Sequence, residues 1–259
     1  METFRKSRAG APAGFFDTEA AGLRWLTVDG GPRVARVLET GPGHLDLERL
    51  DAAPPTAAAA RAFGGRLATL HDAGAPAFGA LPPDAERGWF GPLEDPLDMP
   101  AGAFEDWPTF YAEARLRPIV AQGLERGVLG RRDAEAMEAV CRVLPDLAGP
   151  PDSPARLHGD LWSGNLMWTA DDDGGGTEAA LIDPAAHGGH RETDLAMLAL
   201  FGAPHLDEIL VGYDAVHPLA PGWEDRVALH QLYPLAVHAV LFGGGYVDGT
   251  RRSMAALSG

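Results

Sequence analysis

The chain has 259 residues, of which 46% are hydrophobic and 22% are charged, and its formal net charge at pH 7 is −16. This length and composition indicate a globular protein with a sizeable core, not a disordered chain. The negative charge argues against nucleic acid as a partner, because binding to the phosphate backbone relies on clustered Lys and Arg. No apolar run approaches the roughly 20 residues of a membrane span. Cys141 is the single cysteine, which excludes an intrachain disulfide and favours a reducing cytoplasm.

The N-terminal segment predicts a strand over residues 3–6 and a helix over 15–26. The helix follows from Phe16, Ala20, Leu23 and Leu26, which recur at helical spacing, with Glu19 on a neighbouring face. Lys6 is the only lysine in a chain that otherwise uses arginine. Lysine and arginine are not interchangeable where a compact charge must fit between phosphate oxygens. On spacing alone, however, an exposed Lys6 and a solvated Glu19 remain the simpler interpretation.

The middle of the chain alternates turns and apolar stretches. In chain order, we expect a hairpin of 33–39 and 44–50, a connector at 51–55, a helix over 57–71 capped by Thr56, a long surface loop over 76–102, and helices at about 107–126 and 133–144. The chain from 192 to 257 is predicted to be mostly helical. Pro234 should kink or divide the apolar stretch 227–242.

A group of polar residues at fixed spacing follows the helix expected at about 133–144. Asp160 precedes Asn165 by five residues, and Asp183 comes eighteen residues later behind an apolar run. Short strands at 165–168 and 179–182, joined by a polar turn at 171–176, would form a hairpin that brings Asn165 and Asp183 together. Kinase-type phosphoryl transfer needs such a set: Asp160 as the base for the hydroxyl proton, and Asn165 and Asp183 as Mg²⁺ ligands. A surface hairpin with ordinary Asp and Asn turn caps is the alternative.

Three neighbouring residues have predicted supporting roles. His158 is expected to prop the loop by hydrogen bonding, and Asp194 to anchor it or to cap a helix. Trp162, on the loop beside Asp160, either stacks on the carbon skeleton of a substrate or packs against the large, mostly helical part of the protein that follows residue 50.

The stretch His-Gly-Asp-Leu-Trp-Ser-Gly-Asn at 158–165 resembles a signature of the fructosamine kinases, also called ketosamine-3-kinases. The resemblance continues through segments 106–111, 115–118, 182–185, 189–196, 200–202 and 242–246. It implies an α+β, two-lobe fold like that of protein kinases. Residues 1–50 would form a small β-rich nucleotide-binding lobe that is incomplete, and residues 51–259 a larger, mostly helical lobe for catalysis and substrate.

The same resemblance implies an ATP- and Mg²⁺-dependent kinase acting on a small molecule. Its substrate would be a ketosamine, a sugar attached to an amine such as a glycated lysine, phosphorylated on the 3-hydroxyl so that the amine is later freed. Lys6 would hold the phosphates and pair with Glu19. The Glu48 carbonyl and the Leu50 amide would meet the adenine edge.

Two departures from the family pattern keep alternatives open. No Gly-rich phosphate loop precedes Lys6, so we expect either a reading frame that begins too late or a truncated small lobe. Asp95 and Leu97 stand where the family often carries Gln and Asn. The alternatives are an aminoglycoside-type or other small-molecule hydroxyl kinase, and a non-catalytic nucleotide-binding protein.

Overall fold

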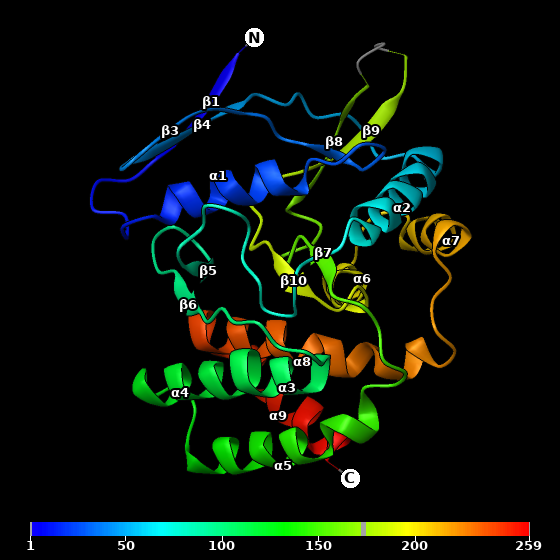
Figure 1. Ribbon diagram of the computed structural model, residues 1–259. Helices are drawn as coiled ribbons and strands as arrows, with labels where there is room; N and C mark the ends of the chain where they lie inside the picture. Colours follow the sequence, from blue (N-terminus) through cyan, green and yellow to red (C-terminus); the bar gives the residue numbers. More distant parts are fainter. Residues whose placement is uncertain (1, 172–174, 259) are drawn as a thin grey trace.

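A three-stranded antiparallel sheet and one helix form the N-terminal part of the molecule (Figure 1). The computed structural model describes residues 2–171 and 175–258. The sheet contains, in spatial order, β1 (Thr3–Ser7), β4 (His44–Glu48) and β3 (Val37–Gly41), and one face packs against α1 (Phe15–Leu26). Phe16, Ala20, Leu23 and Leu26 are each at most 2% exposed. The predicted helix and its apolar stripe are therefore confirmed.

The predicted hairpin between the two halves of the polar motif is also present. It consists of β8 (Leu166–Ala170) and β9 (Thr177–Leu181), and part of its predicted turn, 172–174, lies outside the described residues. The single strand expected over 33–39 is wrong. β2 (Arg33–Val34) pairs in parallel with β9, whereas β3 pairs with β4. The chain changes sheets between Ala35, whose amide donates to the Leu181 carbonyl, and Arg36, whose carbonyl accepts from the Glu48 amide.

Two helices pack closely beside this hairpin. α2 (Ala57–Asp72) begins after Thr56 as predicted, because the Thr56 hydroxyl accepts from the Ala59 amide at 3.1 Å. α7 (Leu206–Val216) crosses α2 at Gly64 and Gly212. A Cβ atom on Gly64 would lie 1.9 Å from the Ile209 carbonyl oxygen, so only glycine allows the two backbones to approach this far.

The segment 76–102 is not simply the surface loop expected from its Pro and Gly content. It contains a hairpin of β5 (Gly88–Phe90) and β6 (Leu97–Met99). Phe90, Leu97 and Met99 are buried in the hydrophobic core of the second lobe. The prediction fails because each strand has only three residues, too few for an alternating pattern to stand out in the sequence.

Helices make up most of the remaining chain, as expected (Figure 1). The other elements are α3 (Trp107–Tyr111), a π-helical turn η1 (Ala112–Leu116), α4 (Arg117–Glu125), α5 (Arg131–Leu147), β7 (Ala155–Leu157), β10 (His187–Gly189), α6 (Glu192–Phe201), α8 (Trp223–Phe242) and α9 (Gly245–Leu257). Among the described residues, no helix is long and apolar enough to cross a membrane.

Pro234 does not divide α8, which continues through it. The hydroxyl of Tyr111 bridges the helix one residue before the proline: it accepts from the Tyr233 amide at 3.0 Å and donates to the Leu229 carbonyl at 2.8 Å. Leu229 and Tyr233 are four residues apart, so the hydroxyl stands in for one helical hydrogen bond where proline crowds the turn.

Candidate active site

The loop that carries Asp160 is held in place by hydrogen bonds to a buried carboxylate. Asp194, near the start of α6, accepts the backbone amides of His158 (2.8 Å) and Gly159 (2.9 Å). Burial alone would raise the pKa of Asp194, but hydrogen bonding to His71 and the charge interactions around it outweigh burial and hold the pKa below its usual range. Gly159 has φ 82°, and a Cβ there would lie 2.2 Å from the Ala185 carbonyl oxygen, so the loop needs glycine at this point.

His158 links the same loop to the strand that precedes Asp183. Its Nε2 lies 2.9 Å from the Ile182 carbonyl, and its Nδ1 accepts the Asp160 amide at 3.2 Å. This geometry matches the propping role expected of His158, and it fixes the tautomer with the proton on Nε2.

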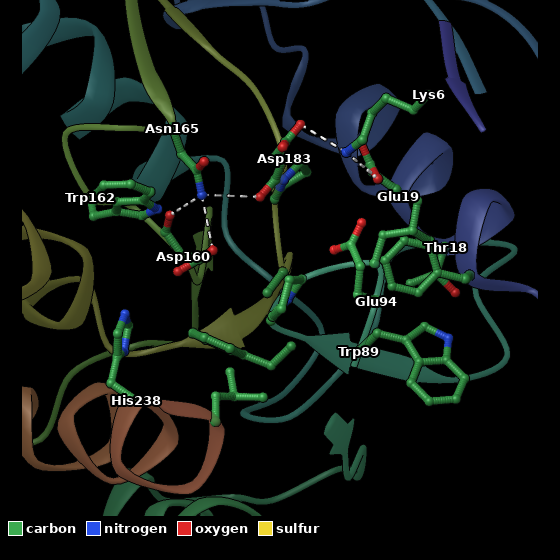
Figure 2. A pocket seen from close by; sticks show the side chains of 18 of the residues that line it. Lys6, Thr18, Glu19, Trp89, Glu94, Asp160, Trp162, Asn165, Asp183 and His238 are labelled. Carbon is green, nitrogen blue, oxygen red and sulfur yellow. Dashed lines mark hydrogen bonds and ion pairs between the residues drawn. The ribbon is translucent and has the colours of Figure 1, made fainter. Parts of the chain in front are cut away.

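Asp160, Asn165 and Asp183 converge at the ends of the β8–β9 hairpin (Figure 2). The Asn165 amide nitrogen donates to the Asp160 backbone carbonyl and to Asp160 Oδ2, both at 2.9 Å, and to the Asp183 carbonyl at 3.4 Å. Asp183 has φ 53°, a left-handed conformation uncommon outside glycine. Burial raises the pKa of Asp160 to about 7, although the hydrogen bond from Asn165 opposes the rise.

Lys6 reaches this group from the first strand of the other lobe. Its Nζ lies 2.8 and 2.9 Å from the two Glu19 carboxylate oxygens and 3.0 Å from Asp183 Oδ1. Burial alone would lower the pKa of Lys6, but Glu19 and Asp183 together raise it, so the ammonium stays charged. The solvated alternative for this pair is therefore wrong in the structure: Glu19 is only 6% exposed.

These residues line one cavity of about 530 Å³. Trp162 also lines it, 38% exposed, with its ring packed edge-on against Phe201 at 6.1 Å between centroids. Both interpretations of Trp162 are thus compatible with its position. The Glu48 side chain lies elsewhere, beside Arg33 in a second cavity, and the Leu50 side chain is buried in the core beneath the sheet. Their predicted backbone contacts with adenine stay predictions.

The side-chain oxygens of Asn165 and Asp183 suit a hard divalent cation as ligands. Within the described residues, no hydrogen bond occupies Asn165 Oδ1 or Asp183 Oδ2, since Asn165 uses its amide nitrogen and Asp183 uses Oδ1 on Lys6. Amide and carboxylate oxygens of this kind are the ligands that Mg²⁺ accepts.

Comparison with known proteins decides the family. The fructosamine kinase family model matches residues 2–258. The chain belongs to the fructosamine kinase family. A probable ketoamine kinase of Enterococcus faecium is 33% identical over 94% of this chain and 83% of its own length. A second, from Lactiplantibacillus plantarum, is 34% identical over 90% of this chain and 78% of its own length.

Solved structures agree. A candidate fructosamine-3-kinase from Thermobifida fusca is 45% identical and superposes with a TM-score of 0.88, covering 98% of this chain and 85% of that one. The gentamicin–APH(2″)-IIa complex, at 13% identity and a TM-score of 0.59, covers 98% of this chain and 83% of that one and shares the fold alone. The α+β, two-lobe kinase-like fold is thereby confirmed, and the protein is a kinase.

Against the fructosamine kinase pattern, Asp95 is a departure with a structural explanation. Its carboxylate oxygens lie 2.6 and 2.9 Å from the two terminal nitrogens of Arg126 at the end of α4. The Leu97 side chain is buried in the core. Neither side chain lines the cavity with Asp160, so these two departures do not change the residues that line it.

Sequence reasoning missed two residues of the site. His71 lies between the Tyr213 hydroxyl (2.8 Å) and Asp194 (3.2 Å), where it supports the carboxylate that anchors the loop carrying Asp160. Glu94 lines the cavity itself. No signal in the sequence marks either, because both depend on contacts between segments far apart in the chain.

Proposed function

We propose that this protein is an ATP- and Mg²⁺-dependent kinase that phosphorylates the 3-hydroxyl of ketosamines in the cytoplasm. The phosphorylated adduct would then decompose and free the amine, which repairs glycation. The supporting observation is that Asp160, Asn165, Asp183 and the Lys6–Glu19 pair meet in one cavity of a fructosamine kinase family member.

Each group has a part in this chemistry. Asp160, with a pKa near 7, orients the acceptor hydroxyl and takes its proton as the phosphoryl group transfers. Asn165 and Asp183 would hold Mg²⁺, which neutralises charge on the nucleotide phosphates when bound. Lys6, kept charged by Glu19, binds a phosphate oxygen. The backbone at Glu48 and Leu50 would take the adenine edge, and Trp162 would form one wall for the sugar.

Phosphate transfer from Mg²⁺-ATP to defined acceptors tests the proposal. Ribulosyl-lysine should be turned over far better than kanamycin or choline, and two-dimensional NMR of the product should place phosphate on O3. A preference for kanamycin would favour an aminoglycoside-type kinase instead. Nucleotide binding without transfer to any acceptor would favour a non-catalytic protein.

The Asp160→Asn variant tests the role of the base. Its turnover should fall about 10³-fold, because positioned proton acceptors contribute roughly 10²- to 10⁴-fold. The KM for Mg²⁺-ATP should stay within a few-fold, since Asp160 is not a proposed metal ligand. Asp146→Asn, an exposed carboxylate on α5, is the control. Near-normal turnover of Asp160→Asn would remove Asp160 from the chemistry.

A further inference from the structure

We propose that Glu94 selects amine-bearing acceptors by forming an ion pair with the protonated amine of the ketosamine. This inference rests on the proposed function and adds a specificity residue to it. Glu94 lies in the segment 91–96 between β5 and β6, and its side chain turns into the cavity that contains Asp160 and Asp183 (Figure 2).

The segment around Glu94 is held in place on both sides. Arg8 donates to the Leu93 carbonyl, immediately before Glu94, and Asp95, immediately after it, is paired with Arg126. Gly91, with φ 96°, lies against Leu241 of α8, where a Cβ would come within 2.8 Å of a leucine methyl. The carboxylate is therefore presented by an anchored backbone, even though the side chain itself is exposed.

The charges around the cavity leave Glu94 available for a ligand. Lys6 is the only Lys or Arg among the described residues that line this cavity, and its ammonium is engaged by Glu19 and Asp183. Burial lowers the pKa of His238, so that ring is neutral near pH 7. Within the described chain, no ion pair or hydrogen bond satisfies the Glu94 carboxylate. An acceptor that brings a positive charge gains attraction here, and an anionic acceptor is repelled.

The remaining walls suit the same kind of ligand. Trp89, Phe90, Trp162 and Phe242 line the cavity with aromatic surface, which attracts organic cations as well as sugar carbon faces. In a ketosamine the amine nitrogen is only four bonds from O3. A substrate with O3 at Asp160 therefore carries its ammonium within the same cavity that Glu94 lines.

The test compares a charged acceptor with a neutral one. A ribulosamine of ethylamine carries a single protonated amine, and its N-acetyl derivative carries none. Glu94→Gln should raise the KM for the charged acceptor about fivefold, the effect expected of one partly exposed ion pair. Turnover, the KM for Mg²⁺-ATP and the kinetics of the neutral acceptor should change little. Glu94→Lys should raise the KM for the charged acceptor further, and Glu105→Gln, an exposed carboxylate outside the cavity, should behave as wild type.

The possible failures are distinguishable. If the wild type phosphorylates neither acceptor, the proposed function fails. If the wild type is active and Glu94→Gln keeps the full preference for the charged acceptor, the role of Glu94 is overturned. An equal loss on both acceptors with a raised KM for Mg²⁺-ATP would assign Glu94 to the nucleotide and would also overturn it.

Discussion

Lys6 contacts residues from two separate parts of the chain. Its ammonium lies between both oxygens of Glu19 and one oxygen of Asp183, which is 177 positions away in sequence. A compact ammonium can meet three oxygens from different directions, whereas a planar guanidinium presents its donors in a fixed fork. The geometry gives a physical reason why a chain that uses arginine elsewhere has lysine at this position.

Replacing Lys6 by Arg should therefore be nearly as harmful as replacing it by Met. We expect kcat/KM for Mg²⁺-ATP to fall by about two orders of magnitude in both variants, because charge without the right shape cannot pair with Glu19 and reach a phosphate. Steady-state kinetics at saturating ketosamine measure this, with Arg132→Lys on the exposed surface of α5 as the control for the exchange of charge type. An Arg variant that kept most of the activity would show that Lys6 supplies only charge.

The site residues divide according to how far apart their partners lie. Asp160, Asn165 and Asp183 could be predicted because a local spacing and one hairpin bring them together. Lys6 and Glu19 could be singled out because Lys6 is unique in the chain and Glu19 follows on a predicted helix. His71 and Glu94 could not, since His71 contacts Asp194 across 123 positions and the backbone around Glu94 is held by distant residues, Arg8 on one side and Arg126 on the other.

The elements show a similar division. The ends of α1, which has clear periodicity, and of α2, which has the Thr56 cap, could be predicted closely. The strand expected over 33–39 was wrong because Arg33–Val34 pairs with β9, a strand more than 140 positions later in the sequence. The hairpin β5–β6 was missed because each strand has only three residues.

The close crossing of α2 and α7 depends on glycine in both helices. Gly212→Ala places a Cβ 1.9 Å from the Arg61 carbonyl oxygen, so the two helices must separate. We expect a loss of about 3 kcal/mol or more in the free energy of unfolding, at the upper end for overpacked cores. Gly65→Ala is the matched control on α2, where the nearest atom is a Val216 methyl 3.3 Å away. Urea unfolding measures both, and equal stability of the two variants would show that the crossing yields easily.

At the scale of the whole molecule, the two lobes are joined at the site. β2 pairs with β9, the Ala35 amide donates to the Leu181 carbonyl, and Lys6 bonds Asp183. The division at residues 50 and 51, read from the sequence, follows the end of β4, but the pairing of β2 with β9 crosses it. The elements that bind the first lobe to the second are the same ones that position Asn165 and Asp183.

Two buried histidines make the stability of the whole fold depend on pH. His187 and His190 are each 4% exposed, and burial lowers the pKa of both to about 3, with Arg115 lowering that of His187 further and His230 that of His190. Both are neutral in the folded protein near pH 6, whereas the unfolded chain takes up protons below about 6.5. A depressed histidine pKa therefore contributes stability above pH 6.5 that is lost as the pH falls toward 3.

Urea unfolding between pH 7.5 and 5 should show this loss, roughly 2 kcal/mol for each histidine by pH 5. His187→Asn removes one titrating ring but can still donate to the Ala185 carbonyl, which accepts from His187 Nδ1 at 2.8 Å. Its free energy of unfolding should fall less steeply with decreasing pH, even if the variant is less stable at pH 7.5. His205→Asn, which removes an exposed histidine, should leave the slope unchanged. A slope for His187→Asn equal to that of wild type would mean that His187 is protonated in the folded protein, with water or a rearranged loop taking up the charge beneath β10.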